Sequence, residues 1–104
     1  MCDNKGMAYE IKTTNIFDKW FAKIKNMQHR ARIISRIDRI QLGNFGDYKN
    51  VSNNLFELRF FFGPGFRIYY TIKGKEVVIL LSGGDKSNQE TDIQKAKNIM
   101  ETLK

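Results

Sequence analysis

The sequence has little of several residue types that specify common architectures: it contains one cysteine, Cys2, one proline and one histidine, His29. A single cysteine cannot form a disulfide within the chain, and no Cys or His spacing matches a structural zinc site. No apolar run is long enough to cross a bilayer, and no signal-peptide pattern is present. We therefore expect a cytoplasmic protein that works without a metal, another cofactor or a membrane.

Positive charge is in excess, because 18 Lys and Arg residues against 11 Asp and Glu residues give a formal net charge of +7. Such a balance favours a polyanionic partner, either nucleic acid or an acidic protein. Small basic domains also carry a charge of this kind when it serves only to keep them in solution. Composition alone does not decide between these two interpretations.

The length of 104 residues suffices for one hydrophobic core and is too short for two. Residues 1–7 are polar up to the second methionine, and we expect them to form a disordered leader. Residues 8–104 are predicted to form a single domain, because no repeat, low-complexity tract or linker divides them.

The first half of this domain is predicted to hold a short strand and two helices. Residues 8–12 alternate apolar and polar side chains, as a strand does. Thr14 or Asn15 can cap a first helix, and residues 29–42 are predicted to form a second one. The short break at residues 25–28 would make them an antiparallel hairpin. The inward side chains of the second helix would be Ile33, Ile34, Ile37 and Ile40.

The second half has the pattern of a β-sheet followed by a helix. Turn residues separate strand-like segments at residues 47–51, 55–61, 66–73 and 76–82. In the last segment, the odd-numbered and the even-numbered positions are both apolar, which is typical of a strand covered on both faces. Ser87 and Glu90 have the spacing of a capping box, which would open a C-terminal helix. We predict an α+β fold with an N-terminal strand, a two-helix hairpin, an antiparallel sheet of three to four further strands, and a C-terminal helix.

Two arginines, Arg59 and Arg67, lie in apolar strand segments on either side of the Gly63-Pro64-Gly65 turn. A buried arginine is costly unless it is paired, so each must face water or a partner. Because side chains alternate, the even-numbered positions of both strands are predicted to face the core. The odd-numbered positions would share an open face, from which four side chains project: Glu57, Arg59, Arg67 and Tyr69.

A three-residue turn would place Arg67 opposite Phe61 in the neighbouring strand. It would also place Tyr69 opposite Arg59. The open face is then either a solvated sheet surface of little energetic value or a site for an anion. The anion site is favoured, because guanidinium groups suit phosphate oxygens and Tyr69 can stack or donate a hydrogen bond.

Several short sequences occur in an order that is shared with a known group of proteins. They are Thr14-x-x-Phe17-x-x-Trp20, the arginine-rich second helix, Gly43-Asn44-x-Gly46-Asp47-x-Lys49, Glu57-Leu58-Arg59, Gly63-Pro64-Gly65-x-Arg67-x-Tyr69 and Gly83-Gly84-Asp85-Lys86-Ser87-x-Gln89-x-x-Asp92-Ile93. With the order of elements, they resemble the RelE/ParE toxin superfamily, and most closely its phage-type addiction-module killer proteins, a HigB-like branch. The resemblance runs from about residue 9 to the C-terminus and implies a RelE-like fold.

The resemblance implies the toxin component of a type II toxin–antitoxin module. Its RelE and HigB groups imply a ribosome-associated, metal-independent endoribonuclease that cleaves mRNA, inhibits translation and arrests growth. Its ParE group implies instead a poison of DNA gyrase. A third interpretation is a noncatalytic basic module that acts with its antitoxin in repressing its own operon. The implied partners are the ribosome, mRNA and a cognate antitoxin, which would be a helix-turn-helix protein encoded nearby.

Enzymes of this superfamily let the RNA 2′-OH attack the adjacent phosphate, which requires proton transfer and cations around the developing charge. The resemblance implies that Arg67 and Arg59 stabilise the phosphate. Glu57 and Tyr69 are the candidates for the acid and base. The C-terminal helix offers Asp92, but no tyrosine or histidine where RelE-type enzymes place an aromatic base.

Further cations lie at the ends of strands and along the second helix. Lys86 and Lys49 are placed either to clamp phosphate or to be solvated loop lysines. Asp85 is predicted to accept backbone N–H groups near the next helix, and His29 to be solvated. The second helix carries three arginines at helical spacing, Arg32, Arg36 and Arg39. They form either a solvated face or a surface that binds RNA or the antitoxin.

Overall fold

The computed structural model describes residues 8–103, so the predicted leader at residues 1–7 lies outside the described part. The α+β class is as predicted, with three helices and one five-stranded sheet among the described residues. The elements in chain order are β1 (Glu10–Thr13), α1 (Asn15–Ala22), α2 (Met27–Gln41), β2 (Tyr48–Ser52), β3 (Leu55–Arg59), β4 (Phe66–Lys73), β5 (Val77–Asp85), a 3-10 turn (Lys86–Asn88) and α3 (Gln89–Thr102).

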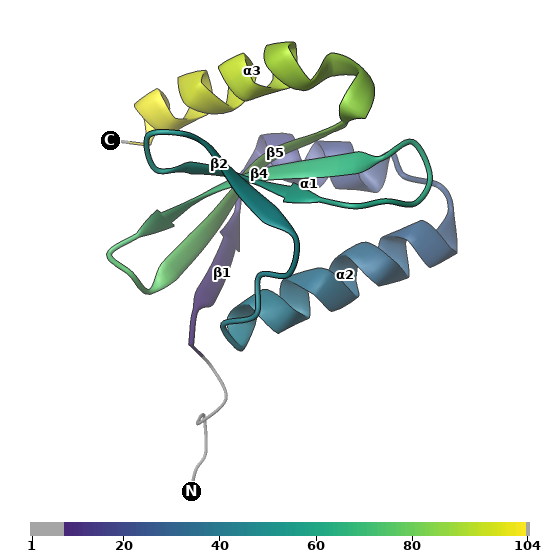
Figure 1. Cartoon of the computed structure of the whole chain (residues 1–104), viewed down its shortest axis with the longest axis horizontal. Coiled ribbons are helices and arrows are strands. Elements are labelled where there is room, and N and C mark those ends of the chain that lie inside the picture. The colour runs from purple at the N-terminus through teal and green to yellow at the C-terminus, as the bar shows by residue number, and fades with distance from the viewer. Residues whose placement is uncertain (1–7, 104) are drawn as a thin grey trace, which may run out of the picture.

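The strands form one sheet in the order β1-β5-β4-β3-β2 (Figure 1). The four later strands are antiparallel neighbours, as predicted. In contrast, β1 pairs with β5 in parallel, with Glu10 beside Val77, a partner and a direction that the predicted N-terminal strand had left open. Alternation in a short strand shows which residues share a face but not which way the strand runs. The long connection between β1 and β5 permits the parallel pairing.

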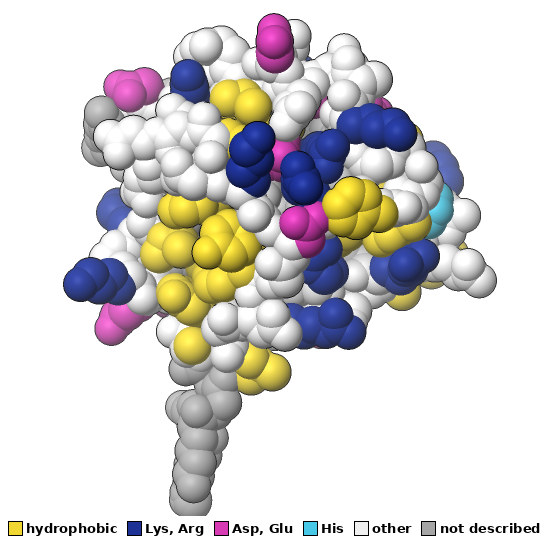
Figure 2. All heavy atoms as spheres, in the orientation of Figure 1, with side chains coloured by type: hydrophobic (Ala, Val, Ile, Leu, Met, Phe, Trp, Pro, Cys, Tyr) yellow, Lys and Arg dark blue, Asp and Glu magenta, His cyan; other side chains and the backbone are white. Residues whose placement is uncertain are grey.

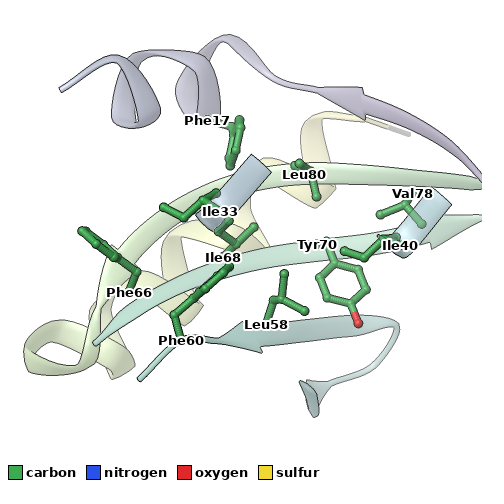
Figure 3. Close-up of a cluster of buried hydrophobic side chains, with 10 residues drawn as sticks. All are labelled: Phe17, Ile33, Ile40, Leu58, Phe60, Phe66, Ile68, Tyr70, Val78 and Leu80. Carbon is green, nitrogen blue, oxygen red and sulfur yellow. The ribbon is translucent and has the colours of Figure 1, made fainter. Parts of the chain in front are cut away.

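Helices cover both faces of the sheet, with α2 on one side and α3 on the other (Figure 1). On the first side, Phe17 of α1 and Ile33 and Ile40 of α2 pack against the even-numbered positions of β3 and β4 (Figure 3). This confirms the predicted core face. On the second side, Ala96 of α3 is buried against Leu55, Tyr69 and Leu81. The odd-numbered face that was predicted to be open is therefore largely covered by α3.

The second helix begins earlier than predicted because Asn26 caps it. The Asn26 side chain accepts hydrogen bonds from the backbone N–H groups of Gln28 and His29, at 2.9 and 3.0 Å. Ile33 and Ile40 are fully buried, as predicted, but Ile34 is 46% exposed, which corrects its inward assignment. A residue next to Ile33 in sequence is rotated by about 100° around a helix, which carries Ile34 to the edge of the buried face.

Two consecutive glycines near the end of β5 let both helical layers approach the sheet closely. A Cβ atom at Gly83 would collide with the ring of Trp20 in α1. A Cβ atom at Gly84 would collide with the carboxyl group of Asp92 in α3. Successive strand residues point to opposite faces, so one glycine serves each layer.

The start of α3 differs from the predicted capping box. Asp85, not Ser87, supplies the acceptor: its side chain accepts the backbone N–H of Ser87 at 2.9 Å and also binds the Ser87 hydroxyl. This confirms the predicted structural role of Asp85. Asn88 is the N-cap residue of α3 and makes no side-chain capping hydrogen bond. Ser87 lies within the 3-10 turn, one residue before the N-cap position, so it is not placed to cap α3.

Candidate functional site

The candidate site lies on the odd-numbered face of β3 and β4, beside the start of α3. Arg59 lies directly opposite Arg67, and Glu57 lies opposite Tyr69. The predicted pairing is wrong by two positions, although it kept the correct face. The reason is a longer loop: the N–H of Phe60 donates to the carbonyl of Phe66 at 3.0 Å, which closes the chain over residues 61–65 rather than over three residues.

Like charges directly opposite each other destabilise a sheet, so the two arginines need carboxylates nearby. Arg59 Nε lies 3.5 Å from Asp47 Oδ2, and both side chains are partly exposed. Arg67 Nε lies 4.0 Å from Glu57 Oε2, and the Arg67 side chain is 13% exposed. Arg67 Nε and Nη1 are buried and have no hydrogen-bond partner among the described residues. Arg67 therefore keeps hydrogen-bonding capacity that the rest of the site does not use.

Glu57 and Tyr69 form a buried network behind Arg67. The Tyr69 hydroxyl donates to Glu57 Oε2 at 3.1 Å, and Gln89 Nε2 of α3 donates to the same oxygen at 2.7 Å. Both Glu57 and Tyr69 are fully buried, so their predicted projection from an open face is wrong. Burial, and next the charge of Glu57, raises the pKa of the Tyr69 phenol, which keeps it protonated as a donor.

Two lysines lie at the edges of the same face. Lys49 in β2 is exposed and lies opposite Glu57. Lys86 follows β5, and its Cδ would lie 3.0 Å from a Cβ atom at Gly65, so its stem runs over the β3–β4 loop. Figure 2 shows Lys and Arg side chains gathered between α3 and the strands, with acidic side chains among them. The structure thus places four of the predicted cations on or beside the odd-numbered face: Arg59, Arg67, Lys49 and Lys86.

Asp92 of α3 also belongs to this region, although the sequence analysis noted it only as the acidic side chain that the C-terminal helix offers and did not place it among the predicted site residues. Its carboxyl group lies against Gly84, the residue that pairs with Arg67 across the β4–β5 ladder. Burial is the main cause that raises the pKa of Asp92, and the charge of Asp85 acts in the same direction while Lys95 opposes it. The sequence signal that could have revealed this carboxylate is Gly84, because a glycine inside a strand often marks a close approach.

A second basic region is a pocket of about 360 Å³ between α2 and the β3–β4 loop. It is lined by Arg32, Ser35, Arg36, Arg39, Asp47, Arg59, Phe60, Phe61 and Phe62. Arg36 donates to three backbone carbonyls, those of Arg59, Phe45 and Asp47, at 2.8 to 3.2 Å. Burial lowers its pKa. The three helix arginines therefore do not form one uniform surface, because Arg36 is a structural residue.

His29 is only partly exposed, so the prediction that it is solvated holds in part. Its ring centroid lies 5.2 Å from that of Phe62 and 5.4 Å from that of Phe66, beside the β3–β4 loop. In residues 8–103, no group of three or more His, Cys, Asp or Glu side chains is placed to hold a metal ion. No helix in the same range is long and apolar enough to cross a membrane.

Comparisons with known proteins cover nearly the whole chain. The sequence model of a family described as "Phage derived protein Gp49-like (DUF891)" matches residues 19–104. A protein of Haemophilus influenzae described as uncharacterized is 48% identical over 97 residues, which cover 93% of this chain and 98% of that protein. No solved structure matches. The matched family region includes Arg59, Arg67, Lys86 and Asp92.

Proposed function

Since the chain belongs to the Gp49-like family of phage-derived proteins, a family of RelE-like toxins from toxin–antitoxin modules, we propose that it cleaves mRNA at the ribosome without a metal ion. Membership of a toxin–antitoxin family implies a cognate antitoxin as a partner. We further propose that the toxin belongs to the HigB-like branch and that its antitoxin is a helix-turn-helix protein encoded nearby.

The observation that carries this proposal is the pair of arginines that face each other across β3 and β4. Their juxtaposition opposes folding, and Arg67 has two buried nitrogens without a hydrogen-bond partner in the described chain. Such an arrangement suits a ligand with concentrated negative charge. The phosphorane formed when a 2′-oxygen attacks an RNA phosphate is a ligand of this kind.

We assign the proposed chemistry as follows. The Asp92 carboxylate accepts the proton of the RNA 2′-OH, and the 2′-oxygen attacks the neighbouring phosphorus. Arg67 and Arg59 stabilise the phosphorane, and Lys86 donates a proton to the departing 5′-oxygen. The products are a 2′,3′-cyclic phosphate and a free 5′-hydroxyl. The raised pKa of Asp92 supports its role, because a carboxylate that is less acidic than usual is a stronger base.

Glu57 and Tyr69 receive positioning roles in this proposal. Both are 0% exposed, so neither can contact an RNA ribose directly, whereas Asp92 is 9% exposed at the edge of the covered face. Glu57 instead places its negative charge 4.0 Å from Arg67 Nε, while Tyr69 and Gln89 fix its carboxyl orientation. A buried carboxylate held in this way keeps the Arg67 guanidinium in one orientation before the substrate arrives.

Arg67→Ala and Arg67→Lys test the proposal by primer extension on a reporter mRNA with ribosomes. Cleavage by Arg67→Ala should fall roughly 10²–10³-fold, as it does when one oxyanion donor is removed from other enzymes. Arg67→Lys keeps a charge near Glu57 and should fold normally, yet an ammonium group cannot replace the planar fork of donors. Lys73→Ala, at the exposed far end of the same strand, is the matched control. Unchanged cleavage by a folded Arg67→Lys would contradict the assignment.

A second candidate function is inhibition of DNA gyrase, as in the ParE group. The burial of Glu57 and Tyr69 favours it, because these were the residues predicted to transfer protons. A gyrase poison acts by binding and needs no acid or base. A supercoiling assay run beside the primer extension distinguishes the two functions. Inhibition of supercoiling without mRNA cleavage would establish the second one.

A further inference from the structure

We propose that the pocket between α2 and the β3–β4 loop binds one unstacked nucleotide of single-stranded RNA, next to the phosphate held by Arg67. Phe61 stacks on the base, and Arg32, Arg39 and Arg59 contact the backbone. This inference rests on the proposed mRNA cleavage, because it extends the path of the same RNA strand. It adds a binding subsite that lies outside the residues proposed to perform the chemistry, apart from Arg59.

The pocket has the size and the lining of a nucleotide site. Its volume of about 360 Å³ falls within the range of ligand pockets, roughly 300–1,000 Å³. Phe61 is 78% exposed, and it is the most exposed large apolar side chain in the described chain. The core gains little from such a ring. Exposed aromatic rings beside arginines are the usual composition of sites for single-stranded RNA, since every base offers a face for stacking.

The arginines of the pocket divide into fixed and available side chains. Arg36 is occupied by three backbone carbonyls, so it shapes the pocket and is not free to bind. Arg32 lies with its guanidinium carbon 4.1 Å from the centre of the Phe62 ring. Arg39 is exposed at the pocket, and Arg59 forms a partly exposed ion pair with Asp47. Such pairs contribute little energy, so a phosphate can replace this contact.

Arg59 connects the pocket with the proposed cleavage site. It lines the pocket, its guanidinium carbon lies 5.8 Å from the centre of the Phe61 ring, and it is the cross-strand partner of Arg67. A ligand that occupies the pocket therefore continues directly onto the face that carries Arg67. A polymer with one phosphate per base fits this sequence of contacts.

Asp47 favours RNA over an acidic segment of the antitoxin as the occupant. Its side chain lines the pocket and is 40% exposed. An ionised carboxylate only accepts hydrogen bonds, so it finds no donor on an acidic side chain. The amino and imino groups of a base are donors that Asp47 can accept. An acidic peptide would also leave Phe61 without a stacking partner.

Phe61→Ala tests the inference through the affinity for a fluorescent, uncleavable 2′-O-methyl RNA of about seven nucleotides, measured by anisotropy at low salt. Loss of one stacked base should weaken binding by roughly ten- to one hundred-fold. Phe61→Tyr should retain most of the affinity, because it keeps the ring. Tyr48→Ala removes another exposed aromatic side chain, 52% exposed on β2, and should leave binding unchanged. Melting curves check that each variant is folded.

The outcomes separate this inference from the proposed function. Equal affinities of the wild type and folded Phe61→Ala, or no binding of the oligonucleotide by the wild type, would overturn the pocket assignment. If Phe61→Ala instead lost only its affinity for a polyglutamate peptide, the pocket would belong to a protein partner and the inference would also be wrong. If RNA binding depends on Phe61 but the wild-type protein cleaves no mRNA, the result would support the pocket assignment and contradict the proposed nuclease activity.

Discussion

At the scale of single residues, Glu57 shows what alternation in a strand predicts and what it does not. Alternation placed Glu57 on the correct face, together with Arg67 and Tyr69. It gave no information about burial, because the covering helix lies more than thirty residues later in the chain, as the Gln89 hydrogen bond shows. A buried carboxylate is tolerated only with partners, and here they come from β4 and α3.

Asp92→Asn is expected to stabilise the protein near neutral pH and to slow cleavage. Burial raises the pKa of Asp92 above its ordinary value of 3.8, so the folded protein binds this proton more tightly than the unfolded chain does. The free energy of unfolding therefore falls as the pH rises from 3.8 through the raised pKa. An amide does not ionise and avoids this loss. Melting temperatures of both proteins, compared from acid to neutral pH, measure the difference.

The stability gain of Asp92→Asn should disappear below pH 3.8, where the wild-type carboxyl group is also protonated. Primer extension with ribosomes measures the cleavage rate of the same variant. A more stable variant that cleaves less is the expected signature of a residue that serves catalysis at the expense of stability. Full cleavage by Asp92→Asn would remove Asp92 from its proposed role as proton acceptor.

At the scale of elements, the sequence predicted best where local signals act alone. Residues 66–73 were predicted as a strand, and β4 is Phe66–Lys73. Thr14 was one of two predicted caps, and its hydroxyl accepts the N–H of Phe17 at 3.0 Å. The β3–β4 loop was predicted less well, because Gly63 and Gly65 both adopt positive φ and allow several loop lengths. The cross-strand partners of Arg59 and Tyr69 depended on that length.

The position of α3 could not be derived from its apolar stripe. The stripe shows that the helix buries Ala96 and neighbouring residues, and the structure confirms this. It does not show which face of the sheet receives them. β5 is apolar on both faces, so it accepts a helix on either side. The burial of Glu57 and Tyr69, and the contact of Asp92 with Gly84, follow from that unpredicted choice.

Asp85→Asn is expected to loosen the connection between β5 and α3 and to destabilise the protein at neutral pH. Hydrogen bonds from the side chain and then the backbone of Ser87 lower the pKa of Asp85 below 3.8. The stability that this carboxylate contributes is thus fully present above pH 3.8, and it is lost as the pH falls through the lowered pKa. Thermal melts should show a lower melting temperature than wild type at neutral pH, with the two curves converging in acid.

The sign of this effect is opposite to that of Asp92→Asn, although both changes replace an aspartate by asparagine. The two variants therefore control for each other, since any general effect of losing one negative charge would move both in the same direction. Melting temperatures that shift by the same amount and in the same direction in both variants at neutral pH would contradict both assignments.

At the scale of the whole molecule, the cations that give the net charge of +7 have two different roles. Some cations hold the fold: Arg36 binds backbone carbonyls, and Arg30 donates to the carbonyls of Phe21 and Ile24. Other cations lie on either side of Arg59. Arg67 lies on the face beside α3, and Arg32 and Arg39 line the pocket at α2. Formal charge in a sequence does not separate these two groups, because it counts a cation bound to backbone carbonyls and an exposed cation alike. The structure separates them by burial and by hydrogen bonds.

Replacing Arg32 and Arg39 together by glutamine should therefore reduce the salt dependence of RNA binding without unfolding the protein. Each phosphate contact releases counterions, and for single strands the slope of log affinity against log salt changes by about 0.7 per contact. Losing both contacts should make the slope shallower by roughly 1.4. Arg36 must stay in place, because Arg36→Gln would leave the Phe45 carbonyl without this donor and would leave the Asp47 carbonyl with the Arg59 N–H alone.

The matched control replaces Lys73 and Lys75 by glutamine, which removes the same charge from the exposed β4–β5 turn at the other end of β4. Anisotropy titrations of the uncleavable RNA over a range of salt concentrations give the slopes of both variants. If binding follows the overall field of the molecule, the two double variants should change the slope equally. If it follows contacts at α2, only the arginine variant should change it, because counterion release depends on the cations that touch phosphate. A slope that changes in the lysine variant alone would place the RNA at the other end of the sheet.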